Sequence, residues 1–183
     1  MPRLSKIYTR TGDHGTTGLA NGERISKDHP RIQALGDLDE LNSIIGILRS
    51  VCPDSDSLEP KLAAIQHRLF DLGGEIALPN QMLATDEWVT TLECWIDALN
   101  ASLPQLKEFI LPAGTLSTAQ CHHARSVCRR AERSLWQLSQ HESVNSHSLR
   151  YLNRLSDVLF VIARVLARQD GACEVTWKPN QET

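Results

Sequence analysis

The sequence predicts an all-α protein, an antiparallel bundle of five helices preceded by a loop rich in glycine and threonine. Apolar residues recur at spacings of three and four in five segments, which is typical of amphipathic helices. Short connections separate the segments, and short connections favour antiparallel neighbours. We therefore expect a single domain in the 183 residues, with a loop at 1–29, the bundle at 30–170 and a tail at 171–183.

The first two helices follow from the spacing of their apolar residues. Pro30 suits the first turn of a helix, and Cys52-Pro53 ends the pattern that follows it. The second helix is expected from about Leu58 to Ala77, where Pro79 interrupts it. The two apolar stripes are Leu35, Leu38, Leu41, Ile45 and Leu48, and then Leu62, Ile65, Leu69, Leu72 and Ile76.

Three further helices follow. Thr85 is a candidate N-cap for a third helix that carries Trp88, Leu92, Trp95, Ile96 and Leu99 and stops near Pro104. The segment Ser117–Gln120 has the form of a capping box, so we expect it to open a fourth helix running to about residue 140. Asn145-Ser146 opens a fifth helix that reaches about Arg168.

The segment Ile7–Leu19 holds four threonines and three glycines. Glycine costs about 1 kcal/mol per helix position relative to alanine, so the segment is not helical. Its backbone N–H groups and hydroxyls can surround one anion, and Arg10, Arg24 and Lys27 add positive charge. The composition favours a polyphosphate site of a kind different from the common glycine-rich phosphate loops. The alternative is a polar arm that forms a hairpin.

The fourth and fifth helices both carry arginine rows. Arg125, Arg129, Glu132 and Arg133 share one face of the fourth helix. That face is either a phosphate clamp, because guanidinium groups match phosphate oxygens, or a solvated face with ion pairs. On the fifth helix, a polar face holds Arg150, Arg154, Asp157, Arg164 and Arg168, and Asn153 and Ser156 adjoin the apolar stripe. The amide of Asn153 is expected to contact a ligand or to tether two helices.

Two further features carry candidate sites. Asp39, close to Asp37 and Glu40, could pair with an arginine of another helix or subunit, or belong to a solvated acidic turn. The loop FILPAG, which begins at Phe109, is apolar, so its side chains are expected to be buried or to face a ligand. Phe109 itself is either part of the core or part of a binding surface.

The composition limits the classes of function. The net charge of −3 and the pI of about 6.1 disfavour a nucleic-acid binder. No apolar run is long enough to span a membrane, and no signal sequence is evident, so a cytoplasmic location is expected. Five cysteines without a C-x-x-C motif indicate reduced thiols. Cys121-His122-His123 lacks the second ligand pair that a zinc site requires.

Three segments together are far more specific than any one of them. They are TRTGDHGTTGL with GERISKDHPR, then GDLDELNSIIG, then RSVCRRAER with LRYLNRLSDVLFVIAR. In this order and spacing they resemble the propanediol-utilisation (PduO) type of ATP:cob(I)alamin adenosyltransferase, and the FILPAG loop resembles the apolar loop of that family. The resemblance spans Lys6 to Trp177. This chain has His14 where the family often has lysine, and Ala113 where it commonly has glycine.

The resemblance implies a homotrimer of five-helix bundles with active sites between subunits. Each site would transfer the 5′-deoxyadenosyl group of ATP to the cobalt of cob(I)alamin and release triphosphate. Arg125, Arg129, Asp39 and Phe109 would be catalytic, with Asp39 paired to Arg125 across the interface and Phe109 below the corrin. ATP would be bound by Thr9, Arg10, Thr11, Gly12, Asp13, Thr17, Gly18 and Lys27 and by Arg129, Arg130, Glu132, Arg133 and Asn153.

The chemistry implied by the resemblance requires positioning and charge stabilisation. Cob(I)alamin is itself a strong nucleophile, so no activated serine or cysteine is needed. Arginines, Lys27 and Mg²⁺ would stabilise the leaving triphosphate. The sequence does not identify the protein ligands of the Mg²⁺ ion. A cob(II)alamin reductase and an adenosylcobalamin-dependent enzyme are the expected protein partners. The alternatives are a corrinoid- or nucleotide-binding module without transfer chemistry and a helical nucleic-acid binder.

Overall fold

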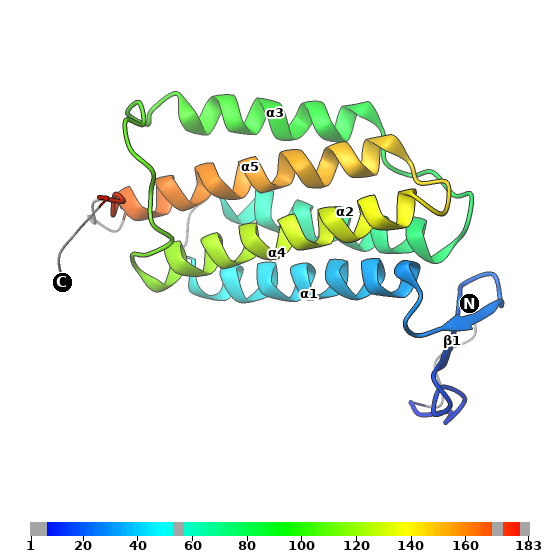
Figure 1. The fold of residues 1–183 in the computed structure, drawn as a ribbon. Coiled ribbons are helices and arrows are strands. Elements are labelled where there is room, and N and C mark those ends of the chain that lie inside the picture. Colours follow the sequence, from blue (N-terminus) through cyan, green and yellow to red (C-terminus); the bar gives the residue numbers. More distant parts are fainter. Residues whose placement is uncertain (1–6, 53–56, 170–173, 180–183) are drawn as a thin grey trace.

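The computed structural model describes residues 7–52, 57–169 and 174–179. Its described part contains five helices and one small hairpin, which confirms the predicted all-α bundle (Figure 1). The helices are α1 (Pro30–Val51), α2 (Glu59–Ala77), α3 (Asp86–Asn100), α4 (Leu116–Ser139) and α5 (Ser146–Gln169). The hairpin pairs β1 (Thr16–Gly18) with β2 (Arg24–Ser26) in antiparallel register, with Thr17 opposite Ile25.

The helices pack in the order that their short connections favour. α1 lies against α2 and α4, α4 lies against α5, and α5 lies against α3 (Figure 1). The core between them consists of the aliphatic stripes, and Leu41, Ile45, Leu62, Leu152 and Leu159 are fully buried. Each such side chain contributes about 1.5–3 kcal/mol on burial. None of the helices in the described ranges combines the length and the hydrophobicity that crossing a membrane requires.

The start of α4 differs from the prediction. Thr115, not Ser117, is the N-cap, and its hydroxyl accepts a hydrogen bond from the N–H of Thr118 at 3.4 Å. Gly114 immediately before it has a φ of 130°, a backbone conformation that favours glycine. The chain turns at this glycine, so the helix begins two residues earlier than the capping box predicts, and Ser117 is buried in the first turn.

The predicted polar face of α5 is wrong at Arg164. This side chain is only 4% exposed, and its Nε donates a hydrogen bond to Glu174 Oε1 at 2.6 Å. Its Nη2 donates to the carbonyl of Pro104 at 2.7 Å. Two segments outside the bundle, the α3–α4 connection and the residues after α5, cover Arg164 and satisfy its charge. Helical periodicity cannot predict such a cover, because both segments are irregular.

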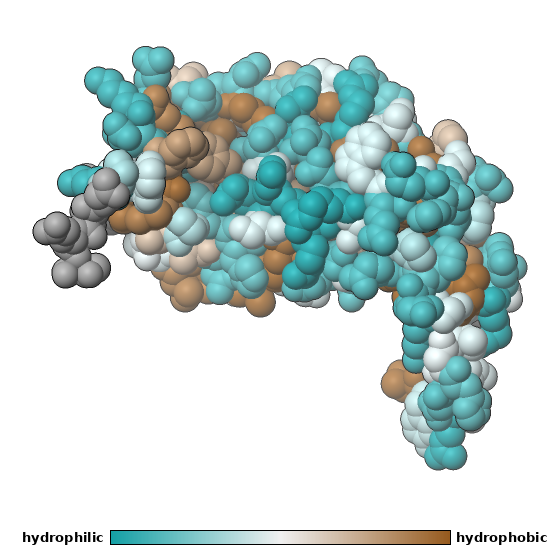
Figure 2. Space-filling model, viewed as in Figure 1, coloured by the Kyte–Doolittle hydropathy of each residue, from teal (hydrophilic) through white to brown (hydrophobic). Residues whose placement is uncertain are grey.

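A protruding segment precedes the bundle. Residues 7–29, called the N-terminal arm from here on, extend beyond the start of α1 (Figure 1), and their surface is mostly hydrophilic (Figure 2). Leu19 is buried, and the N–H of Ala20 donates to the carbonyl of Ala77 at 3.2 Å, which joins the base of the arm to the end of α2.

Candidate functional site

The threonine- and glycine-rich loop of the arm forms successive tight turns. The N–H of Asp13 donates to the carbonyl of Arg10 at 3.4 Å, and that of Gly15 donates to the carbonyl of Gly12 at 3.3 Å. Arg10 and Gly15 have positive φ values of 60° and 79°. Turns of this kind can direct several backbone N–H groups toward one anion. The loop is therefore a series of turns joined to a hairpin, which is compatible with both the phosphate site and the polar arm that the sequence analysis proposes.

A cavity of about 790 Å³ lies between the arm, α1 and α2. Four of the predicted site residues line it, namely Thr17, Gly18, Lys27 and Asp39. Asp39 is exposed and makes no ion pair with any described residue. Phe70 also lines this cavity and is 76% exposed. An exposed carboxylate beside an exposed aromatic ring fits a surface that another molecule covers.

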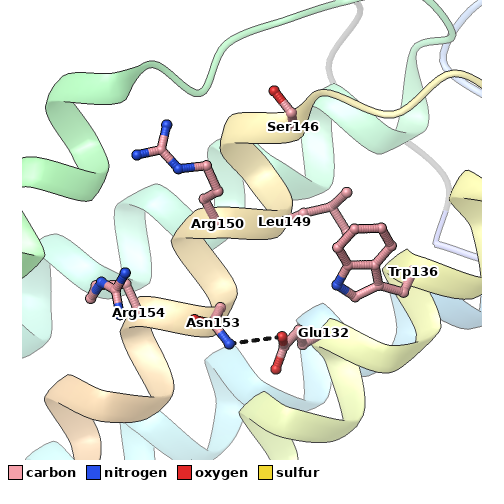
Figure 3. Close-up of a pocket in the computed structure, with 7 residues that line it drawn as sticks. All are labelled: Glu132, Trp136, Ser146, Leu149, Arg150, Asn153 and Arg154. Atoms are coloured by element: carbon pink, nitrogen blue, oxygen red, sulfur yellow. Dashed lines mark hydrogen bonds between the residues drawn. The ribbon is translucent and has the colours of Figure 1, made fainter.

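A second cavity of about 360 Å³ lies between α4 and α5 (Figure 3). The amide of Asn153 donates to Glu132 Oε1 at 3.1 Å across the two helices, so the predicted tether exists. Trp136 and Leu149 form apolar parts of the wall. Glu132 and Asn153 are therefore brought together at one cavity, as the resemblance implies. Trp136 was not singled out from the sequence, because a tryptophan on a helix face is an ordinary core residue.

The arginines of α4 differ in their surroundings. Arg129 and Arg133 are exposed, and neither forms an ion pair with any residue in the described ranges. Arg130 instead donates to Asp37 Oδ1 at 3.2 Å and to Glu40, and these contacts join α4 to α1. The hydrogen bond to Glu40 is the main cause of a raised pKa of the Arg130 guanidinium. Arg129 and Arg133 thus carry positive charge without an ion-pair partner among the described residues, whereas Arg130 is paired with α1.

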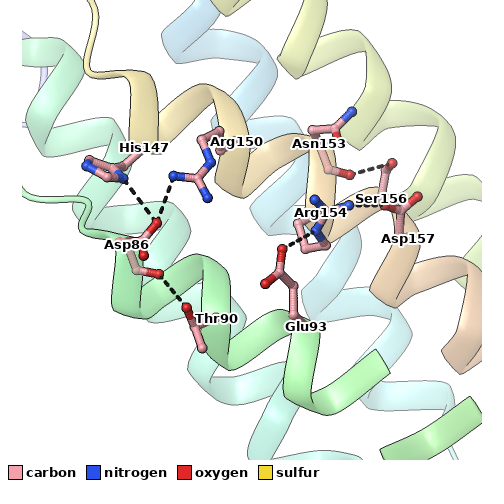
Figure 4. Close-up of polar contacts among 9 residues, drawn as sticks. All are labelled: Asp86, Thr90, Glu93, His147, Arg150, Asn153, Arg154, Ser156 and Asp157. Carbon is pink, nitrogen blue, oxygen red and sulfur yellow. Dashed lines mark hydrogen bonds and ion pairs between the residues drawn. The ribbon is translucent and has the colours of Figure 1, made fainter. Parts of the chain in front are cut away.

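Two other arginines of α5 connect this helix to α3. Arg150 Nη1 donates to Asp86 Oδ1 at 2.7 Å, and Arg154 Nε donates to Glu93 Oε1 at 3.0 Å (Figure 4). Arg154 also binds Asp157 at 3.0 Å. These are partnered surface charges, which usually contribute little to stability. The solvated face with ion pairs therefore describes this part of α5, while the arginine row of α4 is largely unpaired.

A third cavity, of about 630 Å³, is called the aromatic cavity here. Phe109, Phe160 and Trp177 line it together with His122 and Arg125. Phe109 is 78% exposed. Its ring packs edge to face against the ring of Trp177, with 6.4 Å between the two ring centroids. Phe109 is therefore not part of the core. Hydrophobic surface is visible at this end of the molecule, beside the grey C-terminal residues in Figure 2.

Backbone pairing fixes the position of Phe109. The N–H of Trp177 donates to the carbonyl of Phe109 at 2.7 Å, and the N–H of Leu111 donates to the carbonyl of Val175 at 2.8 Å. A single bridge pairs Ile110 with Thr176. The sequence did not assign Trp177 to a site, because the C-terminal tail shows no periodicity. The one usable signal was a tryptophan in an otherwise polar segment.

Two buried polar atoms in the wall of the aromatic cavity have no partner among the described residues. They are Nδ1 of His122 and Nε of Arg125. Burial is the main cause of a lowered pKa of His122, and the positive charge of Arg125 is the second, so the imidazole is neutral near pH 7. Buried polar groups are normally satisfied. These two atoms are therefore exceptions to that rule, and both belong to residues that line the aromatic cavity.

The predicted site residues thus divide into two groups. Asp39 and three of the arm residues, Thr17, Gly18 and Lys27, line the cavity beside α1 and α2, whereas Arg125, Glu132 and Asn153 lie at cavities of α4 and α5. Among the described residues, the first cavity shares no lining residue with the other two. Thr9, Thr11 and Asp13 are exposed in the arm, and Thr9 and Thr11 hydroxyls lie 2.8 Å apart.

Comparison with known proteins identifies the family. The model of the family described as cobalamin adenosyltransferase matches residues 7–166. A cobalamin adenosyltransferase of Cupriavidus metallidurans is 51% identical over 181 residues, covering 99% of this chain and 98% of that protein. A corrinoid adenosyltransferase of Bacillus subtilis is 43% identical, covering 94% of this chain and 92% of that protein.

Solved structures agree with this assignment. A variant of the PduO-type ATP:corrinoid adenosyltransferase from Lactobacillus reuteri, complexed with cobalamin and ATP, matches with a TM-score of 0.89 at 34% identity. The match covers 94% of this chain and 99% of that one. Another variant of the same enzyme, complexed with ATP, matches with a TM-score of 0.87 at 35% identity, covering 94% of this chain and 100% of that one. The chain therefore belongs to the cobalamin adenosyltransferase family, as its sequence pattern predicts.

Proposed function

We propose that the protein transfers the 5′-deoxyadenosyl group of ATP to the cobalt of cob(I)alamin, giving adenosylcobalamin and triphosphate. The observation that carries this proposal is the aromatic cavity. An exposed Phe109 and Trp177 form an apolar wall, and Arg125, one helical turn before the unpaired Arg129, lies at the same cavity. An apolar wall suits a corrin ring, and adjacent unpaired guanidinium groups suit the triphosphate of ATP.

The active site is formed between subunits of a homotrimer. The separation of the arm residues from the α4–α5 cavities supports this arrangement, because one subunit alone does not bring them together. The arm and Asp39 of one subunit meet the arginine row of the next, and Asp39 pairs with Arg125. The unpartnered Nε of Arg125 and the unpaired carboxylate of Asp39 are consistent with such a pair.

The transition state is stabilised by charge and position. As the C5′–O bond breaks, negative charge grows on the triphosphate, where Arg129, Arg133 and Lys27 stabilise it. The cobalt of cob(I)alamin attacks C5′ directly, so the protein holds the two reactants in line. Phe109 lies below the corrin and keeps the lower axial ligand off the cobalt, which eases reduction of cob(II)alamin.

Magnesium fits this site as a companion of ATP. Among the described residues, no three histidine, cysteine or carboxylate side chains gather into a metal site. Mg²⁺ commonly binds through substrate phosphates and one or two carboxylates, and the exposed Asp13 in the loop can supply one. The bound ion would neutralise part of the charge of the triphosphate. Thr9, Arg10, Thr11, Gly12, Thr17 and Gly18 of the arm bind ATP directly.

The cellular setting follows from the reaction. The enzyme acts in the cytoplasm, where reduced thiols persist. A cob(II)alamin reductase supplies its corrinoid substrate in reduced form, and an adenosylcobalamin-dependent enzyme receives its product. No nucleic acid and no membrane take part. Light scattering tests the assembly, because a homotrimer has three times the mass of the 20.4 kDa chain.

Anaerobic incubation with ATP, Mg²⁺ and chemically reduced cobalamin tests the reaction. Absorption spectra should show adenosylcobalamin, and chromatography should show triphosphate in equal amount. Binding of cobalamin and ATP without a new Co–C bond would instead identify a corrinoid- or nucleotide-binding module. Pyrophosphate and phosphate as first products would contradict the proposed transfer.

A further inference from the structure

Arg24 makes an unusual set of contacts inside the N-terminal arm. Its Nη2 donates to the carbonyl of Thr11 at 2.6 Å, to the carbonyl of Thr16 at 3.1 Å and to the hydroxyl of Thr16 at 2.8 Å. Three oxygens of the threonine-rich loop therefore converge on one nitrogen of a strand β2 side chain. Hydrogen bonds from a charged donor are about twice as strong as neutral ones.

Lys27, the other cation at this end of the hairpin, is used differently. Its backbone N–H donates to the carbonyl of Gly15 at 2.9 Å, but its ammonium has no partner within the described ranges. Nζ lies 3.3 Å from the position that a Cβ on Gly12 would occupy. The lysine charge thus lies against the turn and is available to an anion, whereas the charge of Arg24 is already surrounded by loop oxygens.

Peptide geometry connects the contact of Arg24 to the N–H groups of the loop. In a trans peptide the C=O and the following N–H point in opposite directions. Because the carbonyl of Thr11 points toward Arg24, the N–H of Gly12 points away from it. That N–H donates no hydrogen bond to any described residue. The guanidinium therefore orients a free donor on the side of the loop opposite to itself.

We propose that Arg24 is a positioning residue for ATP: it holds the loop in the shape that presents the Gly12 N–H and the Lys27 ammonium to the triphosphate, and does not bind phosphate itself. This inference rests on the proposed function, since it takes ATP as the anion. It also separates two of the three cations that the sequence places near the loop. Lys27 binds the anion, whereas Arg24 shapes the site.

Hydrogen exchange in the absence of ATP tests the role directly. In Arg24→Ala the amides of Asp13, Gly15 and Lys27 should exchange about tenfold faster or more, because their turns lose the charged clamp. The helix amides and the melting temperature should stay unchanged, since the arm lies outside the bundle (Figure 1). Arg68→Ala is the matched control, because Arg68 of α2 contacts Trp88 of α3 and Asp71 and not the arm.

Calorimetric titration with Mg·ATP supplies the second measurement. Arg24→Ala should weaken ATP binding about tenfold or more and leave cobalamin affinity unchanged, and millimolar guanidinium ion should restore part of the ATP affinity. Weaker binding with unchanged exchange in the ATP-free protein would show that Arg24 binds phosphate directly and overturn the proposal. Faster exchange with unchanged ATP affinity, or no change in either, would also overturn it.

These measurements do not depend on the transfer reaction. If the wild-type protein binds ATP and forms no Co–C bond, the proposed function fails, while exchange and ATP affinity still decide the role of Arg24. If the wild-type protein binds no ATP, both the proposed function and this inference fail. Altered exchange in that case would show only that Arg24 shapes the hairpin.

Discussion

The bundle and the N-terminal arm differ in how much of each is buried. Leu41, Leu152 and Leu159 are fully buried between the helices of the bundle, whereas Leu19 is the one buried side chain among residues 7–29 of the arm. The bundle is thus held by apolar burial, which is non-directional and accumulates over many side chains. The arm is held by directional contacts such as the clamp of Arg24. The residues proposed for ATP lie mainly in the arm, where a ligand can compete for or complete such contacts.

Buried polar groups extend the comparison. Glu75, at the end of α2, accepts hydrogen bonds from the N–H of Ala84 at 2.9 Å, from Asn145 Nδ2 at 3.1 Å and from Ser148. It is buried and its oxygens are satisfied, so it fixes where the α2–α3 connection meets α5. The polar atoms of His122 and Arg125 at the aromatic cavity are buried and unsatisfied. The carboxylate of Glu75 thus belongs to the scaffold, whereas the wall of the aromatic cavity lacks such internal pairing at these two atoms.

The largest expected effect is on the scaffold. Leu159→Ala should lower the free energy of unfolding by about 2–5 kcal/mol, because the side chain is fully buried and its removal leaves a cavity. Urea denaturation followed by circular dichroism measures this. The matched arm variant Arg24→Ala should leave the same midpoint unchanged. Equal destabilisation by both variants would show that the arm is part of the cooperative unit.

The next effect is on transfer without a change in stability. Arg129→Ala should lower kcat/KM by roughly tenfold to over a hundredfold, since a charge-assisted hydrogen bond contributes about 1.5–3 kcal/mol. Alanine keeps helix propensity, so helical content should stay the same. Steady-state kinetics with Arg68→Ala as the control measure the change. Wild-type kinetics in Arg129→Ala would show that the arginine row of α4 is a solvated face and not a phosphate clamp.

The intersubunit pair is tested by Asp39→Asn. Removing one partner of a buried ion pair leaves the other charge uncompensated, and such losses reach about 3–5 kcal/mol when the pair is fully buried. Because Asp39 is exposed in the single chain, we expect the lower part of that range, seen as reduced activity and weaker assembly. Light scattering and kinetics on one sample measure both. An active monomer would contradict the intersubunit site.

The repeating parts of the chain could be predicted because periodicity reports burial. The stripes of α1 and α2 are buried as expected, except Leu35, which is half-buried and lines the cavity beside the arm. Arg164 was misassigned because its partners, Glu174 and the carbonyl of Pro104, come from irregular segments. The start of α4 was misplaced because Ser117 and Thr115 are both good caps, and the backbone turn at Gly114 decides between them.

The sequence resemblance proposes the site residues but not their arrangement. The structure distributes them between separate cavities, one lined by the arm, α1 and α2 and another lined by α4 and α5. Local pattern could not separate Arg24 from Lys27, because both are cations near the same loop. Their roles depend on which oxygens surround each charge, and this is a property of the folded hairpin.

Phe109→Ala should act on the cobalt with little effect on stability, because the ring is mostly exposed. Removing it opens space for the lower ligand or water, so bound cob(II)alamin should show more five-coordinate species in absorption and EPR spectra. Activity should fall most in assays that require reduction of cob(II)alamin. Leu111→Ala, in the same loop, is the control. Unchanged spectra together with a loss of several kcal/mol in stability would assign Phe109 to packing.

The smallest effect concerns thiols that the bundle encloses. Burial raises the pKa of the Cys121 thiol and the pKa of the Cys128 thiol well above the ordinary value of a cysteine. The native state therefore holds these protons more tightly than the unfolded chain, whose thiols ionise near about pH 8.5. This contribution to stability is fully present below that pH and is lost as the pH rises above it.

At pH 8, iodoacetamide should label the exposed Cys94 in native protein and spare both buried thiols, whereas urea should expose all three. Peptide mass mapping measures the labelling. If Cys128 reacts as fast as Cys94 in native protein, the interior between α4 and α5 opens more readily than its packing indicates, and the contrast between a bundle closed by apolar burial and an arm held by directional contacts does not hold.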